Sequence, residues 1–203
     1  MPTDQALTPI QVQTLMQAVT IAMLGIVDAS PPTPPTSFQQ VRTSWPTQGQ
    51  PFSKISEDVC YVRAVQVDDD YDKVLDEQTS IIDDDTLQIT DSRTRVWQLF
   101  WVAYGPNSFD RIRQIRKGLM QDATRDTFAA INMYLIPDLP APVRAPELFE
   151  GQWWERTDFS ARFNELVTEY DSAQPVSGVE VIIEVGKNST TNEVVSDITV
   201  EAP

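Results

Sequence analysis

The strongest constraint on the fold is one apolar run near the middle of the chain, RTRVWQLFWVAYG, at residues 93–105. Successive side chains of a β-strand point to opposite faces. Around Gln98, one face of this run carries four large apolar side chains: Val96, Phe100, Val102 and Tyr104. The other face carries Trp97, Leu99, Trp101 and Ala103. Because both faces are apolar, the run predicts a central strand that is covered on both sides.

A helical pattern lies near the N-terminus, at residues 8–28. Apolar side chains recur there at helical spacing, Thr8 is placed to cap the helix, and Pro9 suits its first position. The apolar stripe is wide enough to be covered on more than one side. This helix packs either on its own domain alone or also on a neighbouring subunit.

A second helical pattern follows the central strand, with Asn107 as the expected N-cap. Its expected buried stripe consists of Phe109, Ile112, Ile115 and Leu119. Residues 125–137 begin helical and end extended, and the proline-rich residues 137–149 are expected to be irregular and extended.

Further strand patterns occur at residues 38–45, 58–67, 80–90 and 147–165, and residues 179–185 alternate apolar and polar side chains. The last two are expected to pair as an antiparallel hairpin. Mixed hairpins and helices predict an α+β fold, a mostly antiparallel sheet flanked by helices, with extended proline-rich segments and a C-terminal arm.

Four regions are expected along the 203 residues. Residues 1–29 form an N-terminal helix, and residues 30–37, SPPTPPTS, form a proline-rich linker. Residues 38–186 form the α+β core, and residues 187–203 form the C-terminal arm.

Composition excludes several classes of function. The chain has no histidine, so Ser-His-Asp and Cys-His sites and ordinary zinc sites are out of reach. The net charge of -15 argues against tight binding to nucleic acid or to anionic lipid. No apolar stretch is long enough to span a membrane. We expect a protein that is not an enzyme and has no cofactor.

Acidic residues gather in two loops. One contains Asp68, Asp69, Asp70 and Asp72, and the other contains Asp83, Asp84 and Asp85. Clustered carboxylates can bind calcium or magnesium, but the glycine and distal glutamate of an EF-hand loop are missing. We expect solvated acidic loops that bind no metal tightly.

The basic residues cluster on the second helix: Arg111, Arg113, Arg116 and Lys117. Such a cluster is either a solvated helix face or a contact with an acidic surface of a neighbouring subunit.

Two adjacent tryptophans lie inside the long strand expected at residues 147–165. Trp153 shares its parity with Phe159, Phe163 and Val167, which predicts that it lies in the core. Trp154 shares its parity with polar residues that include Arg156 and Arg162. It is covered by the preceding proline-rich segment, or it anchors a protein–protein contact, since Trp and Arg are enriched at interface hot spots.

Five blocks, in order, carry a family resemblance: WPTQGQPF, YGPNSFDRIRQIRKGL, INMYLIPDLP, RAPELFEGQWWER and GVEVIIEV. Together they resemble the neck, or tail-terminator, proteins of contractile-tailed bacteriophages over most of residues 38–185. The resemblance implies a virion protein, assembled in the host cytoplasm, that forms a homohexameric ring on the tail tube. Such a ring ends the tube and sheath, joins the tail to the head connector and has no catalytic residues or cofactor.

In such a ring, the two Asp-rich loops are expected at the bore or a solvated rim, so that DNA passes without specific binding. The basic helix face is expected to meet an acidic neighbour. Two rival interpretations remain: another head–tail adaptor or tail-completion protein, and an acidic, calcium-dependent binding module.

Overall fold

The structure, a computed structural model, describes residues 6–26, 40–44, 53–83, 86–173, 179–181 and 198–200. Its helices are α1 (Pro9–Met23), η1 (Asp70–Lys73, a 3-10 helix), α3 (Ser108–Gly118) and α4 (Asp122–Ala129). Its longer strands are β2 (Val59–Val67), β3 (Asp76–Asp83), β4 (Thr86–Tyr104) and β9 (Arg156–Ala173). The shorter ones are β1 (Val41–Thr43), β5 (Met133–Leu135), β6 (Val143–Arg144), β7 (Glu147–Phe149), β8 (Gln152–Trp154), β10 (Val179–Val181) and β11 (Ile198–Val200).

The main sheet has seven strands, in the order β1-β2-β4-β9-β5, with β3 also paired to β4 and β6 to β9. The long strands β4 and β9 run antiparallel from the Leu87–Ala173 pair to the Tyr104–Arg156 pair. In this sheet only β1 and β2 pair in parallel. The predicted α+β fold with a mostly antiparallel sheet is therefore confirmed.

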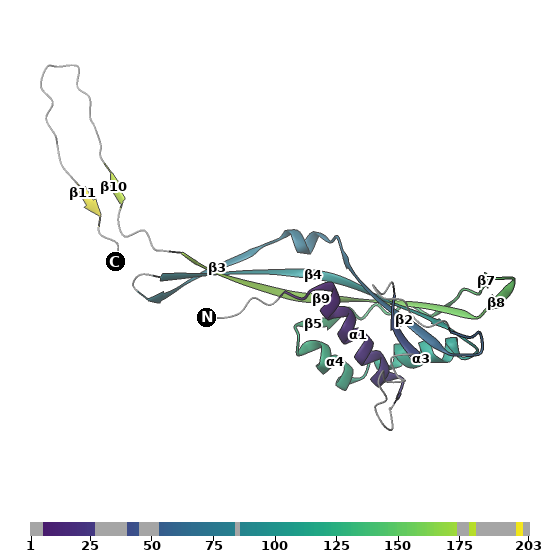
Figure 1. The fold of residues 1–203 in the computed structure, drawn as a ribbon. Helices are drawn as coiled ribbons and strands as arrows, with labels where there is room; N and C mark the ends of the chain where they lie inside the picture. The colour runs from purple at the N-terminus through teal and green to yellow at the C-terminus, as the bar shows by residue number, and fades with distance from the viewer. Residues whose placement is uncertain are drawn as a thin grey trace, which may run out of the picture.

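Helices α1, α3 and α4 lie on one side of the long strands (Figure 1). They cover the odd-numbered face of β4, where Trp97, Leu99 and Trp101 are fully buried. The indole Nε1 of Trp101 donates a hydrogen bond to Thr20 Oγ1 in α1, at 2.9 Å. Phe128 of α4 packs on Phe163 of β9, with ring centroids 4.5 Å apart. The hydrophobic core thus lies between this face and the three helices.

The prediction that β4 is covered on both faces is wrong. Phe100, Val102 and Tyr104 are only partly buried, because in the described part of the chain the three α-helices all lie against the opposite face. Val96 alone among the apolar residues of this face is buried. An even-numbered face that is apolar but half exposed is available for contact with another molecule.

Local signals predicted α1 well and α3 less well. Thr8 caps α1 in a capping box with Gln11, and Pro9 begins the helix, as predicted. Asn107 does occupy the N-cap position of α3, but its side chain donates to Asp58 instead of capping the helix. Phe109 is 38% exposed, so its place in the buried stripe was wrong. Ser108 is buried there instead.

Two strand predictions are also wrong. Residues 80–90 do not form one interrupted strand, because β3 ends at Asp83 and β4 begins at Thr86, and the two pair with each other. The second error concerns β10, which pairs with β11 instead of with the preceding long strand. The proline-rich linker expected at 30–37 lies outside the described residues.

Candidate interaction surfaces

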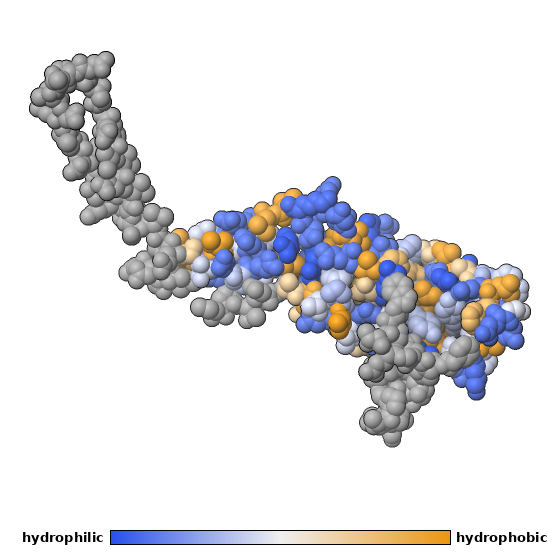
Figure 2. All heavy atoms as spheres, turned by 45° about the horizontal axis from the view of Figure 1, so that its top comes forward, coloured by the Kyte–Doolittle hydropathy of each residue, from blue (hydrophilic) through white to orange (hydrophobic). Residues whose placement is uncertain are grey.

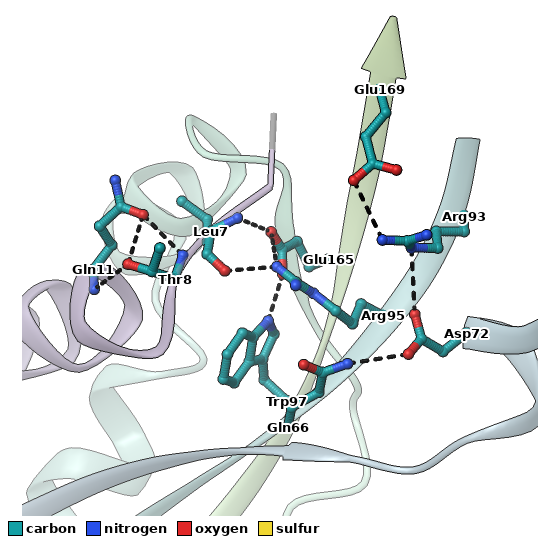
Figure 3. Close-up of polar contacts among 10 residues, drawn as sticks. All are labelled: Leu7, Thr8, Gln11, Gln66, Asp72, Arg93, Arg95, Trp97, Glu165 and Glu169. Atoms are coloured by element: carbon teal, nitrogen blue, oxygen red, sulfur yellow. Dashed lines mark hydrogen bonds and ion pairs between the residues drawn. The ribbon is translucent and has the colours of Figure 1, made fainter. Parts of the chain in front are cut away.

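A buried carboxylate ties the N-terminal segment to the sheet (Figure 3). Glu165 of β9 is 1% exposed and accepts hydrogen bonds from Arg95 Nη2 at 2.8 Å, from the Trp97 indole and from the Leu7 backbone N–H at 2.8 Å. Arg95 also donates to the Leu7 carbonyl at 2.7 Å. Because Glu165 and Arg95 both bond to the backbone of Leu7, this cluster anchors the chain just before α1.

A two-stranded hairpin, β7–β8, extends from the end of the sheet where β4 stops and β9 starts (Figure 1). Its turn residues Glu150 and Gly151 have positive φ values of 48° and 76°, as in the tight hairpin turns that match strand twist. Directly opposite residues share a face, so Leu148 and Trp153 lie together on one face. They are 58% and 68% exposed.

The prediction that Trp153 lies in the core is therefore wrong. Residues 157–167 keep the predicted parity, with Thr157, Phe159, Phe163 and Val167 buried. However, Glu155 interrupts the strand, and β8 pairs with β7 instead of entering the sheet. The odd-numbered face of β8 consequently meets no helix.

Trp154 lies on the inner face of the hairpin. Its ring packs edge-on against Tyr104, with centroids 6.3 Å apart, and against Phe149 at 6.2 Å. Phe149 belongs to the segment that precedes the tryptophans, so one of the two interpretations, cover by that segment, matches the observed contact. The role of Trp154 in contacts between subunits stays a prediction.

Polar bonds fix the base of the hairpin. Glu147 Oε2 accepts from the Tyr104 hydroxyl at 2.8 Å and from Arg156 Nη1 at 3.1 Å. Arg156 also forms a two-pronged ion pair with Asp158, at 2.8 and 2.9 Å. The Gly105 N–H donates to the Glu155 carbonyl at 3.1 Å.

These contacts shift the pKa values of the groups that make them. The hydrogen bond from Tyr104 is the main cause that lowers the pKa of Glu147, with a further contribution from Arg156. Burial, and then the same hydrogen bond, raise the pKa of Tyr104 to about 12. The hydrogen bond to Asp158 is the main cause that raises the pKa of Arg156. The hairpin base is therefore held in one charge state at neutral pH.

A groove of about 700 Å³ lies beside the hairpin, on the even-numbered face of β4, which is called the helix-free face here because no α-helix among the described residues covers it. Its apolar lining comes from β4, from the proline-rich segment and from β6, and includes Phe100, Val102, Pro140, Ala141 and Val143. Arg63 of β2 lies over the Phe100 ring at 5.6 Å, and Arg156 and Asp158 line the groove as well.

The basic residues of α3 differ in their surroundings. Arg116 donates to the carbonyls of Leu139 and Pro140, at 3.1 and 2.9 Å, and so holds the proline-rich segment in place. Arg111 lies 3.9 Å from Asp58, and Arg113 pairs with Asp110. Lys117 is exposed. Arg162, on β9, lies 3.6 Å from Asp138.

The first acidic loop is partly neutralised from within the chain. Lys73 pairs with Asp68 at 3.4 Å and with Asp70 at 3.2 Å, and the hydrogen bond that Lys73 donates to Asp70 is the main cause that raises the pKa of Lys73. Asp69 caps η1 through the Tyr71 N–H. Asp72 lies 3.7 Å from Arg93.

The second acidic loop lies at the β3–β4 connection. Asp83 ends β3, and Asp84 and Asp85 lie outside the described residues. Figure 2 shows hydrophilic residues over much of the surface around β3 and η1, with hydrophobic ones at the β7–β8 end.

In the ranges that the structure describes, no group of three or more His, Cys, Asp or Glu side chains could hold a metal ion. In the same ranges, no helix is long and apolar enough to cross a membrane. Cys60 is buried in β2, and burial raises the pKa of its thiol to about 12.

Sequence reasoning missed the exposure of Leu148 and Trp153, and it missed Asp58 as the partner of Asn107. The signal for the hairpin was present in the pair Glu150–Gly151, which can form a two-residue turn between the apolar residues on either side.

A comparison with curated protein sequences gave no match. The family model described as phage neck terminator protein matches residues 11–192, which cover most of α1 and every described element from β1 to β10. The match includes the main sheet, α3, α4 and the hairpin β7–β8. The chain belongs to the phage neck terminator protein family.

Proposed function

We propose that this chain has a structural, non-catalytic role at the head–tail junction of a phage particle, which its family membership supports. In this role, copies of the chain assemble into a closed ring of six subunits. The ring ends the tail tube and the sheath, and joins the tail to the head connector.

The observation that carries the proposal is the family match over residues 11–192. The surface of the molecule supports it. Among the described residues, no α-helix covers the apolar even-numbered face of β4, and a hairpin presents two large exposed apolar side chains, Leu148 and Trp153. A protein that works alone in water rarely exposes grouped apolar side chains of this kind.

The charge distribution suggests how such a ring treats DNA. Six copies at -15 each would carry 6 × -15 = -90 formal charges. We propose that the Asp-rich loops at residues 68–72 and 83–85 face the bore or a solvated rim, where they repel phosphate and let DNA pass without specific binding. Only loops within roughly 8 Å of the DNA path matter for this at physiological salt.

The basic face of α3 is the proposed contact with an acidic neighbour. Arg113 and Lys117 are the exposed members of this face, whereas Arg116 is engaged with the proline-rich segment. We also propose that the contacts between neighbouring subunits lie at or near Trp154, Arg156 and Arg162. Arg156 acts indirectly, because it fixes the base of the hairpin.

Native mass spectrometry of the purified chain tests the ring, with two-dimensional class averages as an independent count of subunits. We expect six subunits with a central opening. A ring of twelve would instead favour a head–tail adaptor, and a monomer stabilised by calcium would favour the binding module.

The neck location has a separate test. Phage particles made without this protein are expected to show tails that are not joined to heads. Particles made with a tagged chain should show label at the junction of head and tail. Label at the baseplate end of the tail would contradict the proposal.

A further inference from the structure

The exposed face of the hairpin β7–β8 and the groove on the helix-free face form a knob and a hole on one chain. The knob carries Leu148 and Trp153 side by side, held outward by the packing of Trp154 against Tyr104 on the other face. The hole has about 700 Å³ and an apolar lining. That volume lies within the range of roughly 300–1,000 Å³ typical of binding pockets, which is enough for two apolar side chains.

We propose that the hairpin of one copy inserts Leu148 and Trp153 into the groove of a second copy. This inference rests on the proposed ring, and it names the contact between adjacent subunits that would hold the ring together. Because the knob and the hole are different surfaces, each copy uses its knob on one neighbour and its hole on the other. Such head-to-tail contacts close into rings when the rotation between copies permits.

Local charge, not net charge, favours a second copy in this groove. Each copy carries -15 charges, so two copies repel each other overall, and a contact between them needs apolar area or a local cation. The groove supplies Arg63, whose guanidinium already lies over an aromatic ring at 5.6 Å. The incoming hairpin supplies the Trp153 ring, which Arg63 can also approach, and the acidic Glu150 at its exposed turn.

The hairpin is built to keep its shape before it binds. Glu147 is bonded to both Tyr104 and Arg156, and Arg144 Nη2 donates to Glu155 Oε2 at 2.8 Å. An ordered knob loses little conformational entropy when it docks, which favours association. Trp and Arg are also the residue types that dominate the energy of protein contacts.

The first test is Trp153→Ala, with Ile10→Ala on α1 as the matched control. Ile10 is 76% exposed, and it lies far from both surfaces in the sequence. We expect Trp153→Ala to raise the subunit dissociation constant by about 30-fold, as for an aromatic hot spot, and to leave the thermal unfolding of the single copy unchanged. Ile10→Ala should leave both unchanged.

A second test locates the contact. Leu148→Cys copies are mixed with Val143→Cys copies, both in a Cys60→Ala background, and are then oxidised. Val143 lines the groove and is 60% exposed. A disulfide-linked dimer should form only in the mixture. Ile10→Cys in place of Leu148→Cys is the control and should give none.

The outcomes separate this inference from the proposed ring. A wild-type hexamer that survives Trp153→Ala and gives no mixed disulfide would overturn the knob-and-hole contact and leave the ring standing. A covalent dimer from Leu148→Cys alone would also overturn it, since that indicates a two-fold contact between hairpins. A wild-type chain that stays monomeric at all concentrations would overturn both.

Discussion

The two strands β4 and β9 pass through two very different regions of the molecule (Figure 1). In the body, formed by residues 96–104 and 157–165 under the helices, every second side chain is buried. In the arm, formed by β3 with residues 86–92 and 168–173, the strands extend past the helices and their described side chains are half buried or exposed. The backbone pairing is the same in both, so the helices make the difference.

The two regions also use ion pairs differently. Each has one Glu of β9 paired with one Arg of β4. In the body, Glu165 and Arg95 are 1% and 12% exposed, whereas Glu169 and Arg93, at the arm, are 41% and 33% exposed. A buried pair that loses one partner leaves an uncompensated charge, but an exposed pair is replaced by water at little cost.

The largest expected effect comes from shortening one leucine in each region of β4. Leu99→Ala, in the body, should lower the free energy of unfolding by about 3–5 kcal/mol, because it leaves a cavity in a closely packed core. Leu87→Ala, in the arm, removes the same atoms from a half-buried site and should cost less than about 1 kcal/mol.

Urea unfolding of both variants measures this pair of effects. If both variants lost the same free energy of unfolding, the contrast between body and arm would be wrong, because the arm would then be packed as tightly as the body.

The second effect comes from the two glutamates. Glu165→Gln should cost about 2–3 kcal/mol, since the amide keeps one acceptor but leaves Arg95 without its charge partner. Glu169→Gln is the matched control and should cost less than about 1 kcal/mol. Protease cleavage before α1 is a useful second measurement, because loss of the Glu165 contacts also releases Leu7. If Glu165→Gln and Glu169→Gln lowered the free energy of unfolding by similar amounts, the distinction between a buried and an exposed ion pair would be contradicted.

The smallest effect concerns the hairpin, at the other end of the same two strands. The pKa of Glu147 is lowered in the folded chain, so its contribution to stability is present above its ordinary pKa of 4.5 and is lost as pH falls through the lower, folded value. Glu147→Gln should therefore cost up to about 1 kcal/mol at pH 7, since its partners are partly exposed, and this cost should shrink as the pH falls through the lowered pKa of Glu147.

Unfolding of wild type and variant across this pH range measures the difference. Tyr104→Phe removes the donor that lowers the pKa most, and it should shrink the difference. If the difference in free energy of unfolding between wild type and Glu147→Gln grew as the pH fell, the predicted direction of the pH dependence would be wrong.

The adjacent tryptophans illustrate how far sequence reasoning reaches. Alternation identified the buried face of β9 from Thr157 to Val167, because parity is a local property of an extended backbone. It failed at Trp153 because the chain turns out of the sheet at Glu155, and parity carries no information across such a break. Whether β8 joins the main sheet or pairs with β7 depends on where the main sheet ends, and the local pattern of residues does not specify that end.

The sequence by itself determined the fold class, the position and cap of α1, the central place of β4 and the absence of histidine chemistry. Each of these depends on residue type or on spacing within one element. Only the tertiary structure decided which face of β4 the helices cover and that Arg116 holds the proline-rich segment. It alone also decided that Trp153 points outward while Glu165 lies buried against Arg95. These features depend on contacts between residues far apart in the chain, and a pattern within one segment does not specify which distant segment will cover it.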